Sequence, residues 1–384
     1  MFEFGLEEFL FSSAAGGRVG LITNATGRDR HGVHIANRLA GHPRLKLAAI
    51  FTPEHGFGAD APDGEAVASS MHPGYRVPIH SLYGPRKTPS AEELKGIDLL
   101  VYDIQDVGVR FYTYISTLRN TMEAAAQNGI PYHVLDRPDL LGGIAVEGPM
   151  LQSGFESFVG HLPVPIRYGL TPGELSRWWN FRLRVQADLT VWPCQEYRRG
   201  LAFEQLGVPW VKPSPSMCSS STARFYPGTC LYEGTNLSEG RGTEAPFQIL
   251  GAPWVNRERW IELLSPLLPA DVSVSPVTFR PTFSKFEGEE CLGIRLDTSS
   301  PLLENSFGIG IRSLSALIQS HPGLVEFTTR PTLAHPFFDH LAGNSWVRES
   351  LLIGMPPSEI EARATQENAM FASDRKSFLL YPAQ

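Results

Sequence analysis

The strongest constraint on the fold is an alternation, in the first half of the chain, between short apolar runs and segments of helical character. The apolar runs are RVGLITN (18–24), LKLAAIF (45–51), IDLLVYD (97–103) and PYHVLD (131–136). Near-continuous apolar runs of this length are typical of strands that are buried on both faces of a parallel sheet. Strands that alternate with helices indicate βαβ units. The sequence therefore predicts an α/β fold with a Rossmann-like, doubly wound, mostly parallel sheet.

The remaining elements of this half follow from the same patterns. Thr171 followed by Pro172 is typical of a helix start, because threonine caps the first turn and proline fits its first position. Helices are predicted at 30–40, 91–95, 116–128 and 174–183, and a further strand is predicted at 188–193.

The second half of the chain differs from the first in composition and in the pattern of its predicted elements. A Pro- and Ser-rich stretch, VPWVKPSPSMCSSSTARFYPG (208–228), is typical of a crossover or linker. Beyond it, helices are predicted near 256–267, 309–320 and 357–372, and strands near 272–279, 289–296, 325–328 and 377–381. A chain of 384 residues exceeds one typical core. We therefore expect a Rossmann-like domain at 1–225 and a smaller α+β domain at 226–384 that closes a cleft.

Charge and cysteine usage exclude several classes of function. The net charge is −7 and no block of Lys and Arg occurs, which argues against a nucleic acid or an anionic membrane as partner. The 4 cysteines form no C-x-x-C pair, so neither a structural zinc site nor a thioredoxin-like motif is indicated. The first residues, MFEFGLEEFL, carry acids where a signal peptide needs a basic region, so a cytoplasmic location is expected for the chain as given. If a leader has been trimmed, the expectation becomes periplasmic or secreted.

The common cofactor motifs are absent. The first strand is followed by NATGRDRHG, which lacks the G-x-G-x-x-G fingerprint of dinucleotide sites. Neither a Walker loop nor H-E-x-x-H nor G-x-S-x-G occurs. The spacing of His31 and His34 would permit a metal site, but a solvated pair at a helix start is the favoured interpretation. No cofactor and no metal are expected.

The predicted carboxyl ends of the strands carry residues suited to chemistry. In open α/β sheets, ligands bind beyond these ends. Asn24 ends the first strand, Glu54 and His55 follow the second, DIQDVGVRFYTY (103–114) follows the third, and Arg137 follows the fourth. We therefore expect a site at this edge of the sheet.

Glu54 lies in FTPEHGFGAD (51–60), where an apolar run meets a proline and a glycine-rich turn. One interpretation is a carboxylate on an exposed turn. The other is a general acid, which must keep its proton near neutral pH; partial burial beside apolar groups favours the protonated form of a carboxyl. Phe51, Pro53 and Phe57 are candidates for these apolar groups. His55 could orient Glu54, bind substrate or bond the backbone.

Two further segments are dense in polar side chains. The segment 103–114 combines acids, an amide, an arginine and tyrosines, a set that is typical of sugar-binding walls: Asp103, Gln105, Asp106, Arg110, Tyr112 and Tyr114. Asp103 could instead cap a helix, and Arg110 could pair with Asp106. The segment LYEGTNLSEGRGTEAPF (231–247) offers Asn236, Ser238, Glu239 and Arg241 among glycines. It could instead be a polar loop in which Arg241 bridges acids.

Together, these segments resemble the NamZ-type exo-β-N-acetylmuramidases, a family of peptidoglycan glycoside hydrolases. The resemblance runs in order over nearly the whole chain and rests on VGLITNATG, FTPEHGFGAD, PIHSLYG, DLLVYDIQDVGVRFYTYISTL, VLDRPDLLGG, VEGPML, VPIRYGLTPGELSRWWN, FYPGTCLYEGTNLSEGRGTEAPFQILGAPW and FDHLAGN. It implies a Rossmann-like domain, a smaller second domain and a cleft between them. It also implies release of N-acetylmuramic acid from non-reducing ends of peptidoglycan fragments, with Glu54 as the catalytic acid.

The remaining roles are hypotheses from chemistry. N-acetylmuramic acid carries a lactyl carboxylate, for which a bidentate arginine is the natural partner, so Arg110 and Arg241 are the first candidates and Arg137 the next. Asp103, Asp106 and Glu239 are candidates for a second catalytic acid or for stabilising a cation formed from the acetamido group. A non-catalytic carbohydrate-binding protein and an amidase or esterase on the same fold remain as alternatives.

Overall fold

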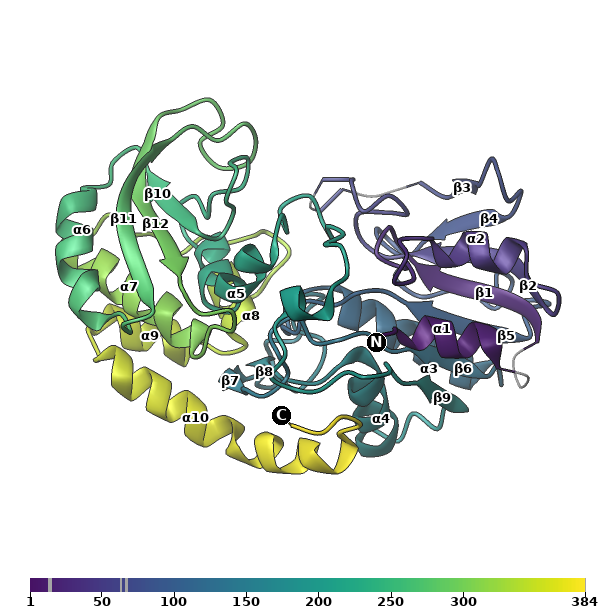
Figure 1. The fold of residues 1–384 in the computed structure, drawn as a ribbon. Coiled ribbons are helices and arrows are strands. Elements are labelled where there is room, and N and C mark those ends of the chain that lie inside the picture. The colour runs from purple at the N-terminus through teal and green to yellow at the C-terminus, as the bar shows by residue number, and fades with distance from the viewer. Residues whose placement is uncertain (13–15, 63, 66–67, 384) are drawn as a thin grey trace.

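The computed structural model describes residues 1–12, 16–62, 64–65 and 68–383, and its larger sheet has seven strands (Figure 1). Their order across the sheet is β3-β4-β2-β1-β5-β6-β9. All neighbouring strands pair in parallel except β3 and β4. The strands are β1 (Gly17–Thr23), β2 (Leu45–Thr52), β3 (Ser70–Met71), β4 (Pro78–Ser81), β5 (Leu99–Asp103), β6 (Tyr132–Leu135) and β9 (Leu189–Trp192). The predicted α/β class and mostly parallel sheet are confirmed.

The central strands are apolar because they are covered on both faces. Every residue of β5 is buried, and so are the last five of β1. The chain runs outward from β1 through β2 to β4 on one side, and outward from β5 through β6 to β9 on the other. The winding therefore reverses between β1 and β5, which is the position where open sheets of this type bind ligands.

Four α-helices pack against this sheet: α1 (Gly5–Phe11), α2 (Ile35–Ala40), α3 (Tyr114–Gln127) and α4 (Pro172–Arg182). The start of α4 was predicted correctly, since Thr171 and Glu174 form a reciprocal capping box. The helix predicted at 30–40 begins only at Ile35, because the His34 ring caps it by accepting from the amide of Ala36. The helix predicted at 91–95 is wrong: these residues form a turn.

A second, smaller region holds a three-stranded antiparallel sheet of order β10-β12-β11. Its strands are β10 (Ile249–Ala252), β11 (Val272–Phe279) and β12 (Cys291–Thr298). Its α-helices are α5 (Ser220–Thr229), α6 (Arg257–Leu264), α7 (Ser306–Ser320), α8 (Phe337–Ala342), α9 (Trp346–Leu352) and α10 (Pro357–Asp374). The 3-10 helices of the chain are Phe203–Leu206, Cys230–Gly234, Ser265–Leu267 and Arg375–Phe378. A smaller sheet and helix region was predicted, but the strands predicted at 325–328 and 377–381 are wrong: Phe327 makes only an isolated bridge, and 375–378 is helical.

Two structures connect the regions. The hairpin of β7 (Glu147–Met150) and β8 (Pro165–Arg167) lies between them, and α10 runs from the smaller region back to α4 (Figure 1). The tail after α10 is held by the first region, since the Tyr381 hydroxyl donates to Asp136 at 2.6 Å. The predicted division between 225 and 226 falls inside α5 and stays a prediction.

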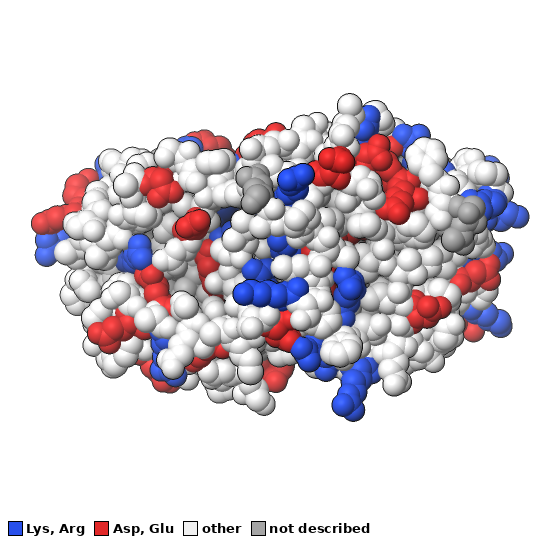
Figure 2. All heavy atoms as spheres, turned by 60° about the horizontal axis from the view of Figure 1, so that its bottom comes forward, with Lys and Arg blue, Asp and Glu red and all other residues white. Residues whose placement is uncertain are grey.

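The surface carries charges of both signs. On the face drawn in Figure 2, basic and acidic side chains are interspersed and neither sign covers the face. Among the described residues, no helix combines the length and apolar character that crossing a membrane would need.

Helices α5 and α7 approach each other through two glycines, which gives the first prediction. A Cβ built on Gly310 would lie 2.4 Å from the carbonyl oxygen of Gly228. We expect Gly310→Ala to lower the free energy of unfolding by about 2 kcal/mol, because backbone must shift to admit the methyl group. Urea denaturation measures this. Gly41→Ala is the control, since no atom lies within 4 Å of its built Cβ; equal stability of the two variants would contradict the prediction.

Candidate active site

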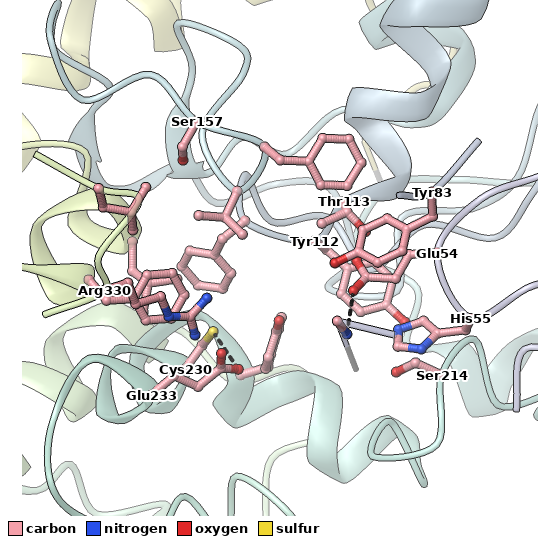
Figure 3. Close-up of a pocket in the computed structure, with 18 of the residues that line it drawn as sticks. Glu54, His55, Tyr83, Tyr112, Thr113, Ser157, Ser214, Cys230, Glu233 and Arg330 are labelled. Carbon is pink, nitrogen blue, oxygen red and sulfur yellow. Dashed lines mark hydrogen bonds between the residues drawn. The ribbon is translucent and has the colours of Figure 1, made fainter. Parts of the chain in front are cut away.

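A cleft of about 600 Å³ lies between the two regions, and side chains from both line it (Figure 3). The first region contributes Glu54, His55, Gly64, Tyr83, Lys87, Phe111, Tyr112, Thr113, Glu156, Ser157, Phe158, Val159, Ser214 and Met217. The second contributes Tyr226, Cys230, Glu233, Arg241, Phe247, Arg330, Thr332, Leu333, Phe337 and Leu341. The cleft therefore has acids, bases and aromatic rings on facing walls, as sugar sites do.

Glu54 is positioned by the turn that ends β2. Pro53 lacks an amide hydrogen and follows the last residue of the strand. The amide of Gly56 donates to the carbonyl of Pro53, and His55 takes a positive φ of 69°. This backbone carries the chain sharply away from the sheet. Glu54 is thereby left 8% exposed in the wall of the cleft.

Two donors hold the Glu54 carboxyl. The Thr113 hydroxyl donates to Oε2 at 2.7 Å, and the Gly64 amide donates to Oε1 at 3.0 Å. Thr113 is the N-cap residue of α3 but makes no side-chain cap bond, so its hydroxyl serves Glu54 instead. Lys87 is also close by: burial lowers the pKa of Lys87, and the negative charge of Glu54 opposes that shift.

His55 also lines the cleft, but one side of its ring is committed to the backbone. Its Nδ1 lies 2.8 Å from the carbonyl oxygen of Ala61, and because a carbonyl only accepts, Nδ1 carries the proton. This bond holds the turn after Glu54 together.

The opposite wall is a network of paired charges. Arg241 donates to Glu233 at 2.7 Å and lies 3.1 Å from Glu239, while its guanidinium carbon lies 5.0 Å from the ring centroid of Phe247. Lys285 lies 3.2 Å from the other oxygen of Glu239. Arg241 thus bridges two acids and also lines the cleft, so the two interpretations offered for it from the sequence both describe its position.

The structure brings four of the sequence-predicted site residues to the cleft: Glu54, His55, Tyr112 and Arg241. Glu239 lies directly behind Arg241. The others do not line it. They are Asn24, Asp103, Gln105, Asp106, Arg110, Tyr114, Arg137, Asn236 and Ser238.

Arg110 is fully buried and is not placed to reach a substrate. Its guanidinium donates to the carbonyl oxygens of Pro149, Val164 and Leu341 at 2.7–3.0 Å. Burial lowers its pKa to about 9. The suggested pairing with Asp106 is not formed either, because the Asp106 carboxylate accepts from Tyr168 and from the amide of Gly108.

A second group of predicted residues surrounds the switch point between β1 and β5. Asp103 is ion-paired with Arg137 at 2.6 Å, and Arg137 in turn lies under the ring of Phe4. Phe4 and residues 208–211 line the hollow there, which measures only about 30 Å³. A sugar needs several times that volume. The position used by ligands in many open sheets is therefore filled by the chain itself.

The other predicted residues stabilise loops. The Asn24 side chain accepts from the amide and hydroxyl of Thr26, and Tyr114 donates to the carbonyl of Pro213. Asn236 bonds the backbone of 324–326 through both side-chain atoms, and the Ser238 hydroxyl accepts from the amide of Gly240. His34 is no metal ligand in this arrangement, since its ring bonds Ala36 and Asn24.

Sequence reasoning did not propose several polar residues of the cleft as site residues, among them Tyr83, Lys87, Thr113, Glu233 and Arg330. Thr113 and Glu233 lie within the two dense segments, so a signal was present for them. Tyr83 and Lys87 follow β4, a four-residue strand too short to be recognised from its pattern. Arg330 comes just after the strand wrongly predicted at 325–328, and only the fold brings it to the site.

Comparisons with known proteins cover nearly the whole chain. Residues 19–221 match the family model described as exo-beta-N-acetylmuramidase NamZ, N-terminal, and residues 224–381 match its C-terminal counterpart. The chain is 40% identical over 366 residues to the peptidoglycan beta-N-acetylmuramidase NamZ of Bacillus subtilis (strain 168), covering 95% of this chain and 87% of that protein. Crystal structures of two DUF1343 family proteins from Bacteroides fragilis NCTC 9343 are also similar. One has a TM-score of 0.88 at 31% identity, with 99% of each chain covered; the other has 0.76 at 28%, with 100% covered.

Asp106 gives a prediction for stability against pH. Burial raises its pKa from 3.8 to about 7, although the bonds from Tyr168 and Gly108 oppose the shift. Because the folded-state pKa is above the unfolded one, unfolding releases a proton between about pH 4 and 7, and this stabilising contribution is lost as the pH rises through that range. The free energy of unfolding of the native protein should thus fall relative to Asp106→Asn by a few kcal/mol between these limits.

Urea denaturation at a series of pH values measures the difference. Asp188→Asn is the control, because Asp188 is exposed. If the curves for the native protein and Asp106→Asn run parallel from pH 4.5 to 7.5, Asp106 does not titrate in this window.

Proposed function

The chain belongs to the NamZ family of exo-β-N-acetylmuramidases, and from that premise we propose that it releases N-acetylmuramic acid from non-reducing ends of peptidoglycan fragments, with Glu54 as general acid. It is a glycoside hydrolase, as its curated relative is. The observation that carries the assignment of Glu54 is its position: a nearly buried carboxyl in the wall of an interdomain cleft, held by two donors.

In the proposed mechanism, Glu54 protonates the glycosidic oxygen as the bond to the anomeric carbon breaks. Thr113 orients the acid, since its hydroxyl can either donate to an ionised Glu54 or accept from a protonated one. Lys87 attracts the carboxylate left after proton transfer, and this favours the transition state in which negative charge develops on Glu54.

Glu233 replaces Asp103, Asp106 and Glu239 as candidate for the second acidic group, since it is the acid that lines the opposite wall. Its carboxylate accepts a hydrogen bond from Arg241 at 2.7 Å, which holds it in place. An ionised carboxylate opposite the acid would stabilise the positive charge that develops on the sugar ring. Tyr83 and Tyr112 offer aromatic rings against which a pyranose can pack.

The first test is Glu54→Gln, assayed with a chromogenic N-acetylmuramide. The amide keeps the shape of the side chain but cannot donate the acid proton, so kcat should fall about 10²- to 10⁴-fold while sugar binding persists. Glu262→Gln is the matched control, because Glu262 is an exposed acid on α6. Wild-type rates in Glu54→Gln would refute the acid assignment. No turnover by the native protein, with intact binding, would favour a carbohydrate-binding protein.

The second test separates orientation of the acid from its presence. Thr113→Val removes the hydroxyl at Glu54 without removing a helix cap bond, because none is formed. We expect kcat to fall about tenfold with KM nearly unchanged, as for loss of one hydrogen bond to a charged group. Thr113→Ser should restore most of the rate. A rate in Thr113→Val equal to that of the native protein would show that Glu54 is oriented without it.

A further inference from the structure

The charges around the cleft do not all pair with one another. Arg241 and Lys285 supply two positive charges, and Glu233 and Glu239 balance them with two negative ones. Glu156 lies exposed at the rim and accepts from the amide of Gly154. Besides Arg241, the cleft lining has two further cations, Lys87 and Arg330, which form no ion pair with any described residue.

Lys87 is committed to the reacting end of the cleft. Its ammonium nitrogen lies 3.8 Å from the ring centroid of Phe158. The negative charge that acts on it is that of Glu54. The negative charge of Glu54 therefore accounts for the position of Lys87 in the cleft.

Arg330 has no such partner. Its guanidinium makes no hydrogen bond or ion pair with the described part of the chain, and its Cζ lies 3.3 Å from the ring centroid of Phe337. Figure 3 shows the guanidinium directed into the cleft above Cys230 and Glu233, on the side away from Glu54. Contact with the ring restricts the guanidinium while its N–H groups stay available at the edge.

The segment that carries Arg330 is fixed to both regions. Its His335 ring stacks on Phe155 of the first region, with ring centroids 4.4 Å apart. The amide of Phe337 donates to the carbonyl of Thr328, which closes the segment at its base. Arg330 is thus held at the rim of the cleft rather than on a free tail.

We propose that Arg330 is a specificity-determining residue, which binds the carboxylate carried by the O3 substituent of an acidic amino sugar. This inference rests on the proposed function of the same cleft. A planar guanidinium binds a carboxylate through two parallel N–H bonds, which a neutral hydroxyl at O3 cannot reproduce. Several bonds separate this carboxylate from the glycosidic oxygen, which agrees with an arginine and an acid on opposite walls. Arg330 then takes the role that the sequence suggested for Arg110 and Arg241.

The experiment changes the charge on each partner separately. Binding of N-acetylmuramic acid and of its methyl ester, which lacks the charge, is measured by calorimetry for the native protein and for Arg330→Gln. The native protein should bind the acid about tenfold more tightly than the ester, as expected for an exposed charge-assisted pair. Arg330→Gln should bind both equally, with an affinity close to that of the native protein for the ester. Arg330→Lys should keep part of the preference.

The chain offers a matched control, Arg363, and an alternative partner for the carboxylate, Lys87. Arg363 also stacks on an aromatic ring, with its Cζ 4.0 Å from the Trp346 centroid, but it lies outside the cleft lining. Arg363→Gln should keep the full preference for the acid. If Lys87→Met abolishes the preference and Arg330→Gln does not, Lys87 binds the carboxylate and the proposal is overturned. Equal binding of acid and ester by the native protein also overturns it.

This readout does not depend on catalysis, so the two proposals can fail separately. A protein that prefers the acid through Arg330 but cleaves no muramide refutes the proposed hydrolysis and retains the inference. A protein that cleaves the muramide while Arg330→Gln still distinguishes acid from ester retains the function and loses the inference.

Discussion

The Arg110 guanidinium is the interaction on which the cleft most depends. It is fully buried and donates to the carbonyl oxygens of Pro149 in β7, of Val164 directly before β8, and of Leu341 in α8. A buried charge is costly unless it is hydrogen-bonded, and the two Nη atoms make these bonds while Nε finds no partner among the described residues. The bonds therefore join the three segments to one another. The walls that carry Glu54 and Arg330 belong to different regions. The distance between the two walls therefore depends on hydrogen bonds such as those of Arg110. It also depends on the tail after α10, in which Tyr381 donates to Asp136.

The same sheet that usually binds a nucleotide serves here as a support for a different site. The switch point between β1 and β5 is filled by Phe4, by the ion pair of Asp103 and Arg137, and by residues 208–211. The cleft instead uses the turns after β2 and β4 together with the start of α3. The ion pair links the end of β5 to the turn after β6, and Glu54 is the acid that faces the cleft.

Electrostatics divides the cleft into two parts. One wall holds internally balanced pairs, Arg241 and Lys285 with Glu233 and Glu239. The other cations face the cleft without an ion pair among the described residues. An anionic sugar is therefore a better electrostatic match for this cleft than a neutral one.

Local sequence patterns determined many of the strands and turns of this protein. Apolar runs predicted β1, β2, β5 and β6 because burial on both faces leaves a readable signal, and Pro53 with its glycine-rich turn marked Glu54. Sequence patterns could not distinguish the role of Glu54 from that of Asp103, since both acids lie at the end of a strand. Only packing shows that Glu54 faces the cleft and that Asp103 faces Arg137. They could not show that Arg110 donates to carbonyls while Arg330 faces the cleft, because that depends on segments distant in the sequence, such as Leu341, 231 residues from Arg110. Short-range spacing fixes strands and turns, whereas the partner of a charged side chain is decided by which distant segments the tertiary structure brings beside it.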